Sequence, residues 1–96
     1  MTKLAIIGTA EIAPGRIDEV LPLLMAHRDR CLKDEPGTRQ FEVLRLRDDD
    51  TKLMLHEVYE NDAAFQAHWN GPSAARAQME TSGMTKITGI RRSLQE

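Results

Sequence analysis

The sequence predicts a single α+β domain with the ferredoxin-like order β-α-β-β-α-β, built on one antiparallel sheet. Three observations carry this prediction. Strand-like segments fall at residues 3–12, 38–47, 53–60 and 85–94, with helical spacing after the first and after the third. A short polar turn joins the two middle strands, as in a hairpin. The chain has 96 residues, the usual size of one domain, so we treat it as one unit.

The first strand is apolar on both faces. One face holds Leu4, Ile6, Ala10 and Ile12. The other face begins with Ala5 and Ile7 and becomes polar at Thr9 and Glu11. A strand of this kind is expected to be covered on both sides for much of its length.

The first helical segment follows a Pro-Gly break after the first strand. Its apolar positions are Ile17, Val20, Leu21, Leu24, Cys31 and Leu32. Pro22 falls inside it, where proline removes a hydrogen bond and crowds the preceding turn, so the helix should kink there or begin irregularly. The stretch DEPGT (34–38) ends the helix with a Pro-Gly turn.

The two middle strands alternate more clearly. In the second strand, Phe41, Val43, Arg45 and Arg47 share a face. In the third, one face carries Leu53, Leu55, Glu57 and Tyr59. The polar stretch RDDDTK (47–52) between them is short enough for an antiparallel hairpin.

The second helical region is interrupted. Asn61 or Asp62 suits its N-cap, and its stripe consists of Ala64, Phe65, His68 and Trp69. Gly71-Pro72 breaks the helix, and Ser73 can cap a second segment that runs to about residue 81. The last strand is weakly patterned and carries Gly89.

This topology places both helical regions on one face of the sheet and leaves the other face open. Because the first strand is apolar on both sides, the open face needs a partner. A second copy packed sheet to sheet about a two-fold axis is the simplest partner. The pattern therefore predicts a homodimer.

Composition argues against several classes of partner. The formal net charge is −2 with a pI near 5.9, and no long basic patch is present, so we expect no nucleic-acid binding. No apolar run is long enough to span a membrane, and no signal-peptide pattern occurs. Cys31 is the only cysteine, which rules out an intramolecular disulfide and fits a cytoplasmic protein.

Two stretches resemble the antibiotic biosynthesis monooxygenase (ABM) family: EPGTRQFEVLR (35–45) and, more specifically, LHEVYENDAAFQAHWNGP (55–72). The likeness extends over nearly the whole chain. It implies a subunit that pairs into a dimeric α+β barrel. The characterised branch with this pattern oxidises quinols or polyphenols with O2 and needs no cofactor, neither metal nor flavin.

Other branches of the family degrade haem or rearrange small phosphorylated ketones, so the fold alone does not decide the reaction. The haem-degrading branch uses an asparagine near the end of the first strand, and LAIIGTAEI (4–12) has none. The alternative to an oxygenase is a non-catalytic dimer that binds a small aromatic molecule, or a non-oxidative enzyme such as an isomerase.

The resemblance and the chemistry together point to His68 and Glu57 as catalytic candidates. An imidazole can take a phenolic proton near neutral pH, and a carboxylate can hold it in one tautomer. The structural alternative is a buried Glu-His hydrogen bond that only ties the third strand to the second helix.

Four further residues are candidates for substrate binding. Trp69 and Tyr59 could hold an aromatic ring, or they could anchor the core or the dimer interface. Phe65 is a third ring candidate, although core packing suits it better. Arg45 could stabilise an anion if its face lines the barrel, or it could pair with a surface carboxylate.

No metal site is expected from the sequence. His27, His56 and His68 lack the spacing typical of zinc ligands, and Cys31 stands alone. No glycine-rich loop opens a helix in the manner of a phosphate-binding loop.

Overall fold

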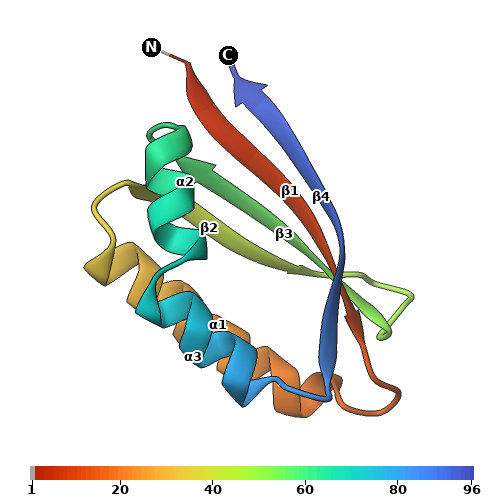
Figure 1. Ribbon diagram of the computed structural model, residues 1–96. Helices are drawn as coiled ribbons and strands as arrows, with labels where there is room; N and C mark the ends of the chain where they lie inside the picture. The colour runs from red at the N-terminus through yellow and green to blue at the C-terminus, as the bar shows by residue number, and fades with distance from the viewer. Residues whose placement is uncertain (1) are drawn as a thin grey trace.

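The computed structural model describes residues 2–96 and confirms the expected order of elements, with the second helical region split in two (Figure 1). The elements are β1 (Lys3–Ile12), α1 (Ile17–Asp34), β2 (Thr38–Arg45), β3 (Lys52–Tyr59), α2 (Asp62–Trp69), α3 (Pro72–Glu80) and β4 (Thr85–Gln95). Within these residues, no helix is long and apolar enough to cross a membrane.

The four strands form one antiparallel sheet in the order β2-β3-β1-β4. All three helices lie on one face of this sheet, and α1 and α3 run side by side (Figure 1). This is the ferredoxin-like α+β fold. The register sets Ile6 opposite Glu57 on β3, so the carboxyl of Glu57 enters the helix-covered layer beside the apolar face of β1.

Helix α1 continues through Pro22 without a break. The helix closes where the backbone N–H of Glu35 donates to the carbonyl of Cys31 (3.0 Å). The next turn is fixed by a hydrogen bond from the N–H of Thr38 to the carbonyl of Glu35 (3.0 Å). These two bonds hold Glu35 at the junction between α1 and β2.

Helix α2 is anchored to the same junction. Asn61 caps its first turn, and the Asn61 side chain accepts a hydrogen bond from the N–H of Ala64 (2.9 Å). Gly37 packs so closely on α2 that a Cβ at this position would lie 2.5 Å from the Cβ of Ala64. The junction can therefore approach α2 only because it carries a glycine, and this approach brings Glu35 near His68.

Helix α3 begins differently from our expectation. Gly71 occupies the N-cap, Pro72 is the first helical residue, and Ser73 is buried inside the first turn. The expectation that Ser73 caps this helix is wrong, because proline already suits the first helical position and leaves no N–H there to be satisfied.

Strand β4 explains the weak pattern of the C-terminal sequence. A register shift opposite Thr9 and Ala10 inserts one extra residue into β4. The side chains that face the helices are therefore Ile87 before the shift and Ile90, Arg92 and Leu94 after it. A bulge of this kind breaks the alternation that a regular strand shows in its sequence.

Helices cover one face of the sheet and leave the other face uncovered (Figure 1). The helix-covered face holds the core, which includes Ile6, Leu53, Phe41 and Tyr59. The other face carries apolar side chains in the open, and among them Ile7 is 45% and Leu44 48% exposed.

Candidate functional site

A cavity of about 580 Å³ lies between the helices and the sheet. Its polar lining includes His27 from α1, Glu57 from β3 and His68 from α2. Its apolar lining includes Phe41 and Leu55 from the sheet. The helical stripe of α2 and the alternation of β3 therefore converge on one cavity, because both elements turn their core faces toward it.

His68 is buried in the wall of this cavity and is held by Glu35. Its Nδ1 lies 2.8 Å from the Oε1 of Glu35, which also accepts a hydrogen bond from the hydroxyl of Thr38 (2.7 Å). A carboxylate oxygen only accepts, so Nδ1 carries the proton in this bond. In the neutral ring, Nε2 then keeps its lone pair, as a general base requires.

Glu57 lies on the other side of the same imidazole, with its Oε1 3.8 Å from the Nε2 of His68. Its carboxyl accepts a hydrogen bond from the hydroxyl of Tyr59, which is fully buried. Burial raises the pKa of Glu57, and the hydrogen bond from Tyr59 and the charge of His68 partly oppose that rise. Burial, with the nearby charge of Glu57, also raises the pKa of Tyr59, so its phenol stays a donor.

His27 and Cys31 of α1 lie next to His68, and of these two His27 lines the cavity. The Sγ of Cys31 lies 3.6 Å from the Nδ1 of His68 and 3.6 Å from both ring nitrogens of His27. Burial, then the charges of His68 and Arg30, lower the pKa of His27 to about 4, so this imidazole is neutral at neutral pH. Burial raises the pKa of the Cys31 thiol to about 12, and the charge of Glu35 adds to the rise.

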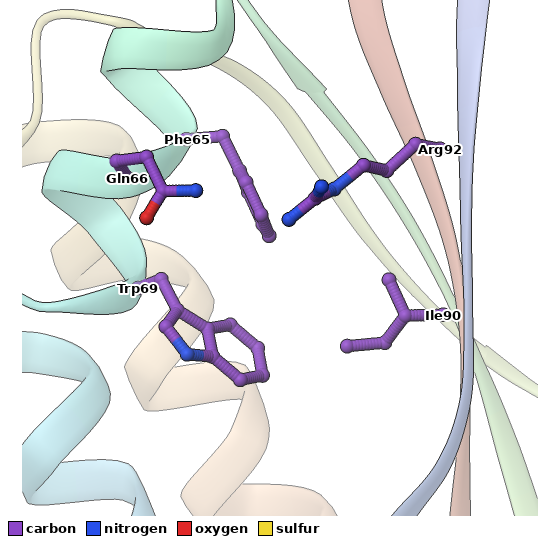
Figure 2. A pocket seen from close by; sticks show the side chains of 5 residues that line it. All are labelled: Phe65, Gln66, Trp69, Ile90 and Arg92. Atoms are coloured by element: carbon purple, nitrogen blue, oxygen red, sulfur yellow. The ribbon is translucent and has the colours of Figure 1, made fainter.

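A second hollow of about 550 Å³ lies between the aromatic side chains of α2 and strand β4 (Figure 2). In Figure 2, Phe65 and Trp69 project from α2 and face Arg92 and Ile90 on β4. The guanidinium carbon of Arg92 lies 5.3 Å from the centre of the Phe65 ring. Phe65, Trp69 and Ile90 also line the inner cavity, so the two spaces adjoin.

The structure brings four of the six sequence-predicted residues to the cavity wall, namely His68, Glu57, Phe65 and Trp69. Tyr59 is not free to hold a ligand, because it is fully buried and its hydroxyl is used by Glu57.

Arg45 does not join the site. Its guanidinium pairs with Asp50 at the hairpin turn (3.1 Å) and lies near Asp18 of α1 (3.7 Å), where the side chain is 43% exposed. Arg45 therefore pairs with surface carboxylates and does not bind in the cavity. The cavity lies between the sheet and the helices and ends before the end of β2 where Arg45 lies.

The tautomer of His68 is set by a residue that sequence reasoning missed. Glu35, rather than Glu57, is within hydrogen-bond distance of the ring. The sequence held part of this signal, because His27 and Cys31 lie four residues apart on one face of α1, and Glu35 follows four residues later, just past the end of the helix. The expectation that Cys31 stands alone is wrong, because its Sγ lies close to the ring nitrogens of His27 and His68.

Several solved structures share this fold. A protein of unknown function from Nitrosomonas europaea, NE2512, is 23% identical, with 99% of this chain and 90% of that chain covered and a TM-score of 0.83. A Chloroflexus aurantiacus protein provisionally assigned as an antibiotic biosynthesis monooxygenase is 17% identical, with coverage of 98% and 93% and a TM-score of 0.83.

A Bacteroides thetaiotaomicron protein of unknown function, described as a possible oxidoreductase, is 11% identical. It has coverage of 98% of both chains and a TM-score of 0.86. At these identities the likeness shows the fold. No curated protein sequence matches the chain.

Family membership comes from the sequence itself. The family model described as antibiotic biosynthesis monooxygenase matches residues 4–80, which run from the first strand through α3 and include His27, Cys31, Glu35, Glu57 and His68. The chain therefore belongs to the antibiotic biosynthesis monooxygenase family.

Proposed function

We propose that this protein is a cofactor-independent monooxygenase that oxidises a quinol-like or polyphenolic small molecule with O2. The observation that carries the proposal is the tautomer in which Glu35 holds His68. Its Nδ1 is tied to Glu35 at 2.8 Å, which leaves Nε2 as the basic atom in the wall of the inner cavity. An aromatic hydroxyl placed against Nε2 would meet an imidazole lone pair that can accept its proton.

The reaction needs no external reductant. The hydroxyl proton passes to Nε2 of His68, and the resulting phenolate gives one electron to O2. Superoxide and the aryloxyl radical combine in the cavity to form a C–O bond at a ring carbon, and the imidazolium returns its proton to the peroxide. Loss of the proton on that carbon, with cleavage of the O–O bond, leaves a second carbonyl and releases one water.

The remaining side chains supply position and exclusion of water. Phe65 and Trp69 offer flat apolar surfaces for an aromatic ring at the passage between the two hollows. Arg92 adds a cation at the outer hollow, which suits an aromatic compound that carries an acidic substituent. The cavity walls hold the reacting groups in position and slow the separation of the radical pair.

Ligand binding can be followed through Trp69, which is the only tryptophan and is 50% exposed. A quinol or a non-oxidisable analogue that fills the cavity should cover the indole and quench its fluorescence in a saturable manner. A titration with and without O2 measures this directly. If saturating analogue leaves the emission unchanged, Trp69 does not line the binding site; if quenching occurs without any oxygen uptake, the protein binds aromatics or catalyses a non-oxidative reaction.

We also propose that two copies associate through the uncovered face of the sheet. Its exposed apolar side chains, Ile7 and Leu44, would be removed from water by a second sheet of the same kind. Light scattering should give twice the chain mass, and Ile7→Asp should shift the mass toward that of the single chain because it places charge in the apolar contact. A single-chain mass for the wild type at micromolar concentration contradicts this assembly.

A further inference from the structure

We propose that four side chains at the α1–α2 junction, His27, Cys31, Glu35 and His68, form a binding site for Zn²⁺. Helix α1 supplies the first two, Glu35 follows at its C-cap with the same four-residue interval, and α2 supplies His68. Donor atoms of His27, Cys31 and His68 already lie within 4.8 Å of one another. His27 and His68 also line the inner cavity, which gives a metal ion a path to the cluster.

The spacing of the donor atoms suits zinc. Zinc bonds of about 2.3 Å to sulfur and about 2.0–2.1 Å to nitrogen, at a tetrahedral angle, place the two atoms roughly 3.6 Å apart. The Sγ of Cys31 lies 3.6 Å from the Nδ1 of His68 and 3.6 Å from each ring nitrogen of His27. A thiolate with two imidazoles excludes Mg²⁺ and Ca²⁺, which prefer oxygen ligands.

Binding requires four local changes. Cys31 loses its proton to become a thiolate, and Nδ1 of His68 gives up the proton that it shares with Glu35. The carboxylate of Glu35, freed from that bond, becomes the fourth ligand. The His27 ring, whose two nitrogens are equidistant from the thiol, turns about its Cβ–Cγ bond to direct one of them at the ion.

Glu57 would orient His68 in the metal site without binding the metal itself. It lies 3.8 Å from Nε2 of His68, the nitrogen that carries the proton once Nδ1 binds the metal. A carboxylate in this position orients a metal-bound imidazole and raises its basicity as a ligand. Occupancy would also remove His68 as a base, so the zinc-bound protein should be inactive. That consequence rests on the proposed function, whereas zinc binding itself does not.

Cobalt titration of the reduced, metal-free protein tests the site without any turnover. Because Cys31 is the only cysteine, a thiolate-to-cobalt charge-transfer band in the wild type identifies it as a ligand with no substitution needed. We expect this band to saturate at one Co²⁺ per chain and to disappear on addition of Zn²⁺. Absence of the band at saturating Co²⁺, or a different stoichiometry, overturns the proposal.

Two histidine variants separate this site from adventitious binding. His27→Ala should weaken Zn²⁺ binding by more than about 100-fold, the upper end of what loss of an outer-shell partner costs. His56→Ala is the matched control, because His56 pairs with Glu42 on the opposite face of the sheet. Equal Zn²⁺ affinity in His27→Ala and the wild type, measured by chelator competition on folded protein, would remove His27 from the site and contradict the proposal.

Discussion

Replacing His68 with alanine should lower the rate of oxygen uptake with a quinol substrate by roughly 10²–10⁴-fold, the usual contribution of a positioned general base. The physical reason is that loss of the hydroxyl proton makes the substrate a better electron donor. O2 accepts an electron from a phenolate far more readily than from the neutral phenol, and His68 is the cavity-lining base whose tautomer is fixed, by Glu35 at 2.8 Å. The rate should be measured by oxygen electrode under saturating substrate, with far-ultraviolet circular dichroism to establish that the variant is folded.

The His68 experiment has a built-in control at Arg45. Arg45→Ala removes a cation that pairs with Asp50 on the surface, so oxygen uptake should stay at the wild-type rate. Unchanged turnover in folded His68→Ala would remove this histidine from the mechanism. A large loss in Arg45→Ala instead would mean that the anion binds at the hairpin end of the sheet, away from the cavity.

Replacing Tyr59 with phenylalanine should lower the free energy of unfolding by about 1.5–3 kcal/mol at a pH where Glu57 is ionised, the range for a hydrogen bond to a charged group. Tyr59 is fully buried and donates to the buried carboxyl of Glu57. Phenylalanine keeps the ring and its contact with Phe65, whose centre lies 5.3 Å away, and removes only the donor. Chemical denaturation at several pH values measures the loss.

The loss in Tyr59→Phe should depend on pH in a defined direction. Burial raises the pKa of Glu57 above its ordinary 4.5, so from pH 4.5 up to the raised pKa the folded protein holds more protons than the unfolded chain. Stability therefore falls as pH rises through this window. Tyr59 opposes the rise in pKa, so its removal raises the pKa further, and the deficit of the variant should grow with pH and shrink in acid.

Glu57→Gln separates this effect from simple loss of packing. When residue 57 carries a neutral amide, the stability difference caused by Tyr59→Phe should no longer vary with pH, because the titrating partner is gone. A deficit that is equal in acid and at neutral pH in the presence of Glu57 would show that the hydroxyl does not act on the charge of this carboxyl.

The strands and helices were predictable where one face of an element is buried throughout. The alternation of Leu53, Leu55, Glu57 and Tyr59 placed Glu57 in the covered layer, and the stripe of α2 placed His68 and Trp69 beside it. These relations follow from periods of two and 3.6 residues and need no tertiary information.

The parts that escaped prediction depend on contacts between distant segments. Glu35 reaches His68 because the turn at Gly37 packs against α2, and no local pattern encodes a contact across 33 residues. Arg92 turns toward Phe65 because a bulge shifts the register of β4. Arg45 shares a strand face with Phe41, yet the cavity ends before it, since the extent of a cavity depends on how helices cover the sheet.

Oxygen uptake by purified, metal-free protein with a panel of reduced quinols and polyphenols tests the central claim most directly. Chelation matters here, because zinc at the α1–α2 junction would occupy His68. Our account predicts uptake above the autoxidation rate, with one quinone product formed for each O2 consumed and loss of that uptake in His68→Ala. Uptake no faster than autoxidation across the panel, with Trp69 still quenched by the same compounds, would contradict the oxygenase assignment and leave a protein that binds aromatics or acts on them without O2.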